Sequence, residues 1–232
     1  MTIEELRKIA LDTGFALTDE MADQLDRYAR LLMVWNEKMN LTAIDTYEEI
    51  VEKHFHDCLE PLQFADIHGK VCDVGSGAGF PGMVWKIARP DLSMTLLEPI
   101  GKRCTFLNEV IHSLDLSGIT VVNERAEDFV KEKRESFDVV TARAVANLQV
   151  LSEVCIPLVK VDGIFVAMKG AQGNEEVKAA ENAVSTLGAA LFKVDEAALS
   201  KGERRMIITY KKVKNTPAEY PRNYGRIKKN PL

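Results

Sequence analysis

The sequence predicts a doubly wound α/β fold, with a mostly parallel seven-stranded sheet and a helical N-terminal cap. From Gly69 onward, short apolar runs alternate with amphipathic stretches of helical length, which is typical of right-handed crossovers in a parallel sheet covered on both faces. Before Gly69, apolar residues recur at three- and four-residue spacing and strand patterns are lacking. We therefore expect a helical cap over residues 1–68 and an α/β domain over residues 69–232, which together form one structural unit.

Two features predict where the helices of the cap lie. Leu25, Tyr28, Leu32 and Trp35 follow one another at three- and four-residue spacing, as on one face of a helix. Thr46 and Glu49 have the spacing of a capping box, which predicts that a further helix begins near residue 47.

The α/β region supplies five strands in chain order and then a hairpin. The strands are predicted at residues 71–74, 94–97, 119–122, 137–140 and 164–167, with helices between them at 102–114 and 148–159. Two later apolar runs, at residues 189–195 and 205–211, are joined by a polar loop and predict an antiparallel hairpin at the sheet edge.

Composition narrows the class of protein. The chain has 232 residues, of which 46% are apolar and 28% charged, as in ordinary globular proteins. No window approaches 18 uninterrupted apolar residues, so we expect no membrane span. The acidic start does not resemble a signal peptide, and we expect a cytoplasmic protein.

We also expect neither disulfides nor a metal site. The four cysteines are far apart in sequence and include no Cys-x-x-Cys pair. His54, His56 and Asp57 invite a metal hypothesis, but residues two apart on a helix point to different faces, which makes a shared ion improbable.

The charge is distributed unevenly along the chain. The formal net charge is -5, yet residues 201–232 carry ten Lys or Arg against two Glu. The last basic residues are interleaved with Tyr220, Pro221 and Tyr224, a combination of cations and stacking groups that is suited to RNA. The predicted RNA-binding residues of this tail are Arg222, Arg226, Lys228 and Lys229.

The most informative segment is the glycine-rich turn that follows the first strand. Gly77-x-Gly79-x-x-Gly82 alone matches a nicotinamide or flavin fingerprint, which is a weak signal. Asp73 followed by Gly75, Gly77 and Gly79 gives the Asp-x-Gly-x-Gly-x-Gly pattern of S-adenosylmethionine-dependent methyltransferases. The glycines let the backbone approach a ligand closely, and the next helix points its N-terminal amides toward that ligand.

Three further strand ends are candidate ligand sites, because ligands of open α/β sheets bind beyond the carboxyl ends of the strands. Glu98 ends the second strand, where a carboxylate accepts hydrogen bonds from ribose hydroxyls in methyltransferases and in dehydrogenases alike. Arg125, Ala126 and Glu127 follow the third strand, at the usual adenine position, although acids at a helix start explain this segment equally well. Arg143 ends the fourth strand, and a buried charge there favours a functional role.

Missing motifs indicate the type of acceptor. The sequence has no Asn/Asp-Pro-Pro-Tyr/Phe segment for exocyclic amines and no strand-end Pro-Cys for pyrimidine C5. Guanine N7 needs neither, since its lone pair lies in the ring plane and carries no proton. Catalysis would then consist mostly of alignment, a proximity effect of roughly 7–11 kcal/mol, without a general base.

The order and spacing of seven segments resemble the bacterial 16S rRNA guanine-N7 methyltransferase family (RsmG, glucose-inhibited division protein B), over essentially the whole chain. These segments are Trp35-Asn36-x-x-x-Asn40-Leu41-Thr42, the turn from Asp73 to Gly82, Leu97-Glu98-Pro99-x-x-Lys102-Arg103, Arg125-Ala126-Glu127-Asp128, Val140-Thr141-Ala142-Arg143-Ala144, Lys169-Gly170 and the tail from Tyr220 to Leu232.

The resemblance implies a class I, Rossmann-like methyltransferase that modifies one guanine of 16S rRNA near the decoding region. It implies S-adenosylmethionine as donor, S-adenosylhomocysteine as product, and the 16S rRNA or the 30S particle as partner. The basic tail and the small acidic body are compatible with a monomer that docks on a large RNA surface. The cofactor contacts that it implies fall on Gly75, Phe80, Glu98, Ala126, Glu127 and Arg143. We place Arg143 and Arg125 near the target base as catalytic candidates, and add Asn36, Asn40 and Lys169 as RNA-binding candidates, the two asparagines at the mouth of the substrate cleft.

Two other functions stay open at this point. One is a nicotinamide-dependent oxidoreductase that uses Gly77, Gly79 and Gly82. The other is a non-catalytic RNA-binding assembly factor that keeps the fold as a scaffold. Binding of S-adenosylmethionine would separate the first alternative from the methyltransferase, and methyl transfer would separate the second.

Overall fold

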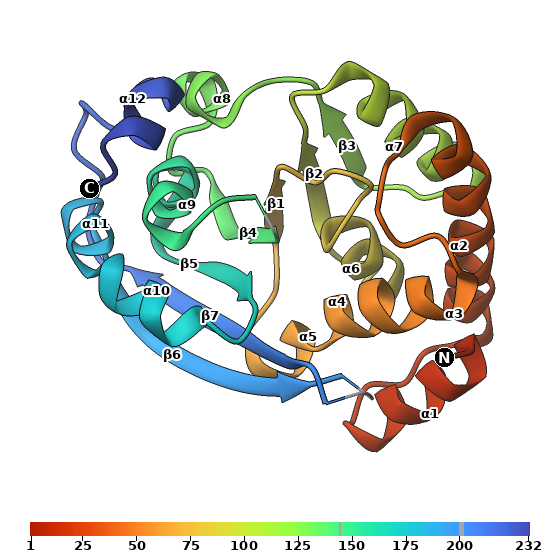
Figure 1. Ribbon diagram of the computed structural model, residues 1–232. Helices are drawn as coiled ribbons and strands as arrows, with labels where there is room; N and C mark the ends of the chain where they lie inside the picture. Colours follow the sequence, from red (N-terminus) through yellow and green to blue (C-terminus); the bar gives the residue numbers. More distant parts are fainter. Residues whose placement is uncertain (144, 200–201) are drawn as a thin grey trace.

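The computed structural model describes residues 1–143, 145–199 and 202–232, and its centre is a seven-stranded sheet (Figure 1). The strand order is β3-β2-β1-β4-β5-β7-β6, and β7 runs antiparallel to the other six strands. The strands are β1 (Lys70–Val74), β2 (Ser93–Leu97), β3 (Ile119–Val122), β4 (Phe137–Arg143), β5 (Val159–Lys169), β6 (Ala189–Ala198) and β7 (Arg204–Lys212). All seven predicted strands are confirmed, including the hairpin at the edge.

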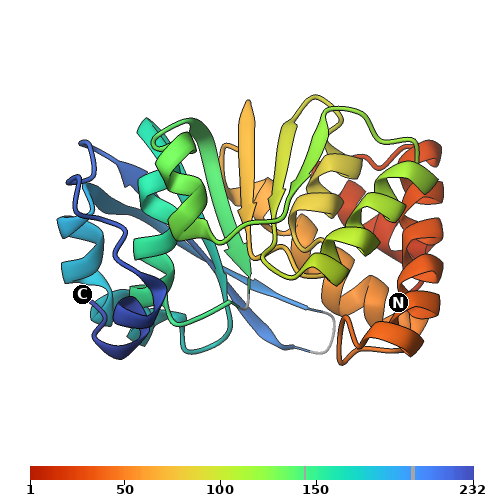
Figure 2. The same ribbon diagram turned by 90° about the horizontal axis from the view of Figure 1, so that it is seen from above.

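Helices cover both faces of the sheet (Figure 2). One layer holds α1 (Ile3–Asp12), α2 (Asp19–Met39), α3 (Tyr47–Ile50), the π-helical segment η1 (Val51–His56), α4 (Asp57–Leu59), α5 (Pro61–Phe64), α6 (Gly82–Ala88) and α7 (Gly101–Ser113). The other holds α8 (Ala126–Lys133), α9 (Leu148–Cys155), the short 3-10 helix η2 (Ile156–Leu158), α10 (Gly173–Ala179), α11 (Glu181–Thr186) and α12 (Tyr224–Lys229).

Successive strand residues supply the two cores. Val139 of β4 packs in the core beneath the N-terminal helices. Val140 and Ala142 of the same strand pack in the core of the second layer. This division follows from the two-residue period of a strand, whose side chains alternate between faces. Since both faces are covered, the central strands are mostly apolar, as the sequence pattern indicated.

The helix that was predicted from Thr46 begins at Tyr47, but its capping interactions differ from the prediction. The Thr46 hydroxyl donates to the Glu49 carboxylate at 3.2 Å, and no side chain caps the helix backbone. A complete capping box lies instead at α1, where Thr2 and Glu5 each accept a hydrogen bond from the other's backbone N–H.

The C-terminal segment is ordered against the second layer. Ile227 of α12 is completely buried, and the backbone oxygen of Leu232 accepts a hydrogen bond from Gln149 at 3.1 Å. In the part of the chain that the structure describes, no helix is long and apolar enough to cross a membrane.

Candidate active site

Three cavities lie beyond the carboxyl ends of the central strands, and we call them A, B and C. Cavity A, of about 360 Å³, is lined by the glycine-rich turn, Phe80, Glu98, Arg103 and Arg143. Cavity B, of about 160 Å³, lies beside it and shares Gly75, Pro99 and Val145 with it. Cavity C, of about 420 Å³, shares His54 and Arg143 with cavity A.

The glycine-rich turn needs its glycines for two different reasons. Gly75 has φ +72°, and a Cβ there would lie 2.8 Å from Cγ2 of Val145; both residues line cavities A and B. Gly79 has φ +104°, and a Cβ there would lie 2.6 Å from the Tyr28 hydroxyl, which donates to the Ala78 carbonyl. The first glycine therefore lets the turn approach Val145 closely, and the second lets the turn pack on α2.

Asp73, at the end of β1, supports the turn by a hydrogen bond to its backbone. Its Oδ2 accepts a hydrogen bond from the Gly82 N–H at 2.9 Å, while its Oδ1 is buried without a partner among the described residues. Burial raises the pKa of Asp73 to about 7, against the lowering effect of the Gly82 hydrogen bond. Asp73 is not among the residues that line cavity A, so it acts through the conformation of the turn.

Glu98 is buried in the wall of cavity A, at the end of β2. Its Oε2 accepts from the Gly77 N–H at 2.8 Å, and its Oε1 accepts from the Ile100 N–H at 2.9 Å. Each carboxylate oxygen has room for a second hydrogen bond. Glu98 can therefore hold the turn and accept from ligand hydroxyls at the same time.

The segment that follows β3 lines cavity B. Arg125, Ala126 and Glu127 line it together with the apolar side chains of Val74 and Leu97. Arg125 thus lies in cavity B, apart from Arg143, which lies between cavities A and C. The structure does not bring the two predicted catalytic arginines together.

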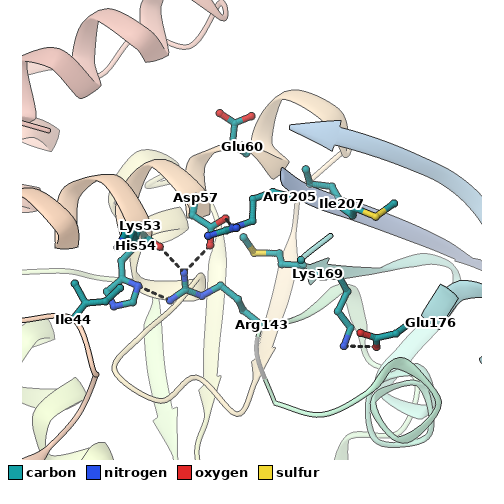
Figure 3. A pocket seen from close by; sticks show the side chains of 13 residues that line it. Ile44, Lys53, His54, Asp57, Glu60, Arg143, Lys169, Glu176, Arg205 and Ile207 are labelled. Atoms are coloured by element: carbon teal, nitrogen blue, oxygen red, sulfur yellow. Dashed lines mark hydrogen bonds and ion pairs between the residues drawn. The ribbon is translucent and has the colours of Figure 1, made fainter. Parts of the chain in front are cut away.

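Arg143 connects the sheet to the N-terminal helices (Figure 3). Its Nη1 donates to Asp57 Oδ2 at 2.8 Å and to the Lys53 carbonyl at 3.2 Å, and its Nη2 lies 2.9 Å from His54 Nδ1. The guanidinium also lies over the ring of Phe80, 4.9 Å from its centroid. Arg143 is therefore fixed where cavities A and C adjoin, whereas Ala144 lies outside the described residues.

His54 is held neutral in this network. An arginine can only donate, so Nδ1 of His54 accepts and Nε2 carries the proton. Nε2 lies 2.9 Å from the Thr42 hydroxyl oxygen and donates to it. Burial, together with the nearby charge of Arg143, lowers the pKa of His54 to about 3. His56, two residues later, pairs instead with Glu60 at 2.9 Å.

Sequence reasoning missed Asp57 and Arg205 as members of the site. Asp57 Oδ1 accepts from Arg205 Nε at 2.9 Å, so one buried carboxylate lies between two arginines from β4 and β7. The sequence gives no local signal for this pair, because its partners are 148 residues apart. Within residues 1–143, 145–199 and 202–232, no group of three His, Cys, Asp or Glu could hold a metal ion.

The predicted RNA-binding residues fall in different places. Asn36 and Asn40 line neither cavity A nor cavity C: the Asn36 amide pairs with the Thr42 backbone at 2.9 and 3.0 Å, and Asn40 ends α2 in a left-handed conformation. Lys169 lines cavity C. Arg222 forms a buried ion pair with Glu153 at 2.6 Å. The exposed cations of the tail are Arg226, Lys228 and Lys229.

The fold and the site define the class first. A seven-stranded sheet with an antiparallel β7, a glycine-rich turn after β1 and an acid at the end of β2 is the class I methyltransferase arrangement. The structure is similar to TYW2 of M. jannaschii in complex with AdoMet, with a TM-score of 0.58, 12% identity, and coverage of 74% of this chain and 80% of that one. It is also similar to TrmN of Thermus thermophilus, with a TM-score of 0.55, 17% identity, and coverage of 68% and 49%.

Sequence comparison then gives the family. Residues 21–207 match the GidB family, described as rRNA small subunit methyltransferase G. Ribosomal RNA small subunit methyltransferase G of Bacillus pumilus (strain SAFR-032) is 44% identical over 100% of this chain and 99% of its own, and that of Bacillus subtilis (strain 168) is 42% identical over the same shares. The chain belongs to the rRNA small subunit methyltransferase G family. The predicted enzyme class, an rRNA methyltransferase, is confirmed, and the oxidoreductase alternative is not supported.

Proposed function

We propose that the protein transfers the methyl group of S-adenosylmethionine to N7 of one guanine in 16S rRNA and releases S-adenosylhomocysteine. The observation that carries the proposal is that cavities A and C adjoin at His54 and Arg143, which line both of them. A donor in cavity A and a base in cavity C would meet beside these two side chains.

The residues of cavities A and B fit the donor. Each oxygen of Glu98 holds one backbone N–H and keeps a lone pair for a ribose hydroxyl. Gly75 lines both cavities, and in cavity B Ala126 and Glu127 would face the adenine ring. When bound, S-adenosylmethionine supplies an electrophilic methyl group on a sulfonium sulfur.

The groups in the wall favour an acceptor atom that has no proton to lose. Nδ1 of His54 is engaged by Arg143, and both oxygens of Asp57 are engaged by Arg143 and Arg205. None of these groups is therefore positioned as a general base. Guanine N7 carries no proton, so its methylation requires alignment and exclusion of water, which the packed ring of Phe80 beneath Arg143 supports.

The RNA surface of this proposal includes the exposed tail cations Arg226, Lys228 and Lys229, together with Lys169 in cavity C. We further propose that the enzyme acts as a monomer in the cytoplasm, on the 16S rRNA or the 30S particle. Residues 1–68 and 69–232 would work as one unit, because both contribute walls to cavities A and C.

The test is methyl transfer from labelled S-adenosylmethionine to 30S subunits that lack the modification, followed by nuclease digestion and mass spectrometry of the nucleosides. We expect 7-methylguanosine from the wild type and a strongly reduced yield from Gly75→Val, which places a branched side chain against Val145 beside cavities A and B. Label in any other nucleoside would refute N7 as the acceptor. Binding of S-adenosylmethionine without transfer would favour the assembly-factor alternative.

A further inference from the structure

Cavity C contains a lysine and a glutamate that form an ion pair in its wall (Figure 3). Nζ of Lys169, at the end of β5, lies 2.7 Å from Oε2 of Glu176 in α10, and it also donates to the Ala146 carbonyl at 2.6 Å. The side chains are 9% and 27% exposed, respectively. The pair is thus fixed on the protein side and open toward the cavity.

Both partners have hydrogen-bonding capacity left. An ammonium group has three N–H donors, and the described contacts of Lys169 use two of them. Oε2 of Glu176 also accepts from the Leu148 N–H at 2.7 Å, whereas no described contact uses its Oε1. A donor and a carboxylate acceptor therefore face cavity C side by side.

The other two carboxylates of cavity C are engaged differently. Both oxygens of Asp57 accept from arginines. Glu60 pairs with His56 at 2.9 Å, and in Figure 3 its carboxylate points away from Arg143 and Lys169.

We propose that Lys169 and Glu176 recognise the Watson–Crick edge of the target guanine, a specificity role that rests on the function proposed above. That edge presents an acceptor and two donors in sequence: O6, N1–H and the 2-amino group. Lys169 presents a donor for O6, and the free Oε1 of Glu176 presents an acceptor for the 2-amino group. Adenine places an amino group where guanine has O6, so it would set donor against donor at Lys169. Since N7 lies on a different edge of the purine, it stays free to face the wall of His54 and Arg143.

The size and charge of cavity C fit a nucleotide. Its volume of about 420 Å³ lies within the usual range of ligand pockets. Its wall carries four cationic side chains and three carboxylates, a polar lining that suits a nucleotide base. The carboxylate of Glu176 contributes selectivity in this surrounding, because a buried acceptor that loses its donor is costly.

The experiment uses 30S particles reconstituted with 16S rRNA that carries either guanosine or inosine at the target position. Inosine keeps N7, O6 and N1–H but lacks the 2-amino group. We expect kcat/KM of the wild type to be roughly 10- to 100-fold lower with inosine, the usual effect of losing a hydrogen bond to a charged group.

Glu176→Gln separates recognition from structure, since glutamine retains an acceptor for Lys169 and Leu148 but opposes the 2-amino group with a donor. We expect this variant to lose the same factor with guanosine and to match the wild type with inosine, within about threefold. Glu175→Gln is the matched control, because Glu175 is an exposed neighbour in the same helix, and it should behave as the wild type with both substrates.

Two results would overturn the inference while leaving the proposed function intact. One is equal kcat/KM of the wild type for guanosine and inosine. The other is a Glu176→Gln variant that loses the same factor with both substrates, as a purely structural residue would. If the wild type formed no 7-methylguanosine from the guanosine particle, the proposed function itself would fail, and this inference with it.

Discussion

The ion pair between Arg222 and Glu153 offers a direct test of whether the basic tail serves the fold or the RNA. Glu153 lies in α9 with its side chain 0% exposed, and the Arg222 side chain is 15% exposed. Arg222 donates three times to this carboxylate: from its backbone N–H at 2.8 Å, from Nε at 2.8 Å and from Nη2 at 2.6 Å. The tail is thereby fastened to the second helical layer.

Arg222→Ala would remove the charge and two of the three donors, and leave a buried carboxylate without a cation. Breaking a buried pair in this way costs about 3–5 kcal/mol. Because Arg222 is not completely buried and the backbone N–H remains, we expect the lower end, about 3 kcal/mol of unfolding free energy. In urea this corresponds to a midpoint lower by about 1 M, for an m-value of about 3 kcal/mol per M.

The assay is urea unfolding followed by circular dichroism, together with the Kd for 30S particles. Arg226→Ala is the control: Arg226 is exposed, so its unfolding free energy should stay within about 0.5 kcal/mol of the wild type. The double variant Glu153→Gln with Arg222→Ala should recover part of the loss, because no buried charge remains unpaired. If Arg222→Ala left the midpoint unchanged and weakened 30S binding, our reasoning about the ion pair would be wrong.

Three further outcomes follow from the site and the tail. Gly79→Ala should lower the unfolding free energy by about 3 kcal/mol in thermal or urea denaturation, because its Cβ would lie 2.6 Å from the Tyr28 hydroxyl at φ +104°; an unchanged melting temperature would contradict this. The pKa of His54 is about 3 in the folded protein and has its ordinary value near 6.5 in the unfolded chain, so protonation favours unfolding. Relative to His54→Gln, the wild type should therefore lose about 3 kcal/mol of stability as the pH falls from 7 to 4.5, and parallel pH profiles of the two proteins would refute the neutral histidine. Replacing Lys228 and Lys229 together by Ala should reduce the slope of log K for 30S binding against log salt by about 1.5, since each phosphate contact contributes about 0.7–0.9; an unchanged slope would exclude them from the RNA surface.

Features that depend on neighbouring residues were predictable from the sequence. The predicted strand at residues 119–122 coincides with β3, and α7 starts and ends within one residue of the predicted helix at 102–114. Apolar periodicity and turn glycines act over a few residues and therefore appear directly in the sequence. The glycine-rich turn, Glu98 and Arg143 lie together at cavity A because ligand sites of open α/β sheets form beyond the carboxyl ends of the strands, which the strand order in the sequence already indicated.

Partnerships across the fold were not predictable from one sequence. The contacts of Asp57 with Arg205 and of Glu153 with Arg222 span 148 and 69 residues. A cation at the surface of a helix and one bound to a buried carboxylate look alike in sequence, because the difference lies in the topology that delivers the partner. Arg222 was therefore predicted to bind RNA together with Arg226, Lys228 and Lys229, although it pairs with the buried Glu153.

The segment formed by η1 and α4 brings Lys53, His54 and Asp57 against Arg143, so the N-terminal helices complete the wall at which donor and acceptor would meet. A chimera that kept residues 69–232 and received a different N-terminal domain would retain the glycine-rich turn but lose this wall. The N-terminal helices therefore cannot be exchanged for an unrelated domain without loss of these contacts. A substitution in the segment from Val51 to Leu59 would change both the substrate cavity and the position of Arg143 at the end of β4.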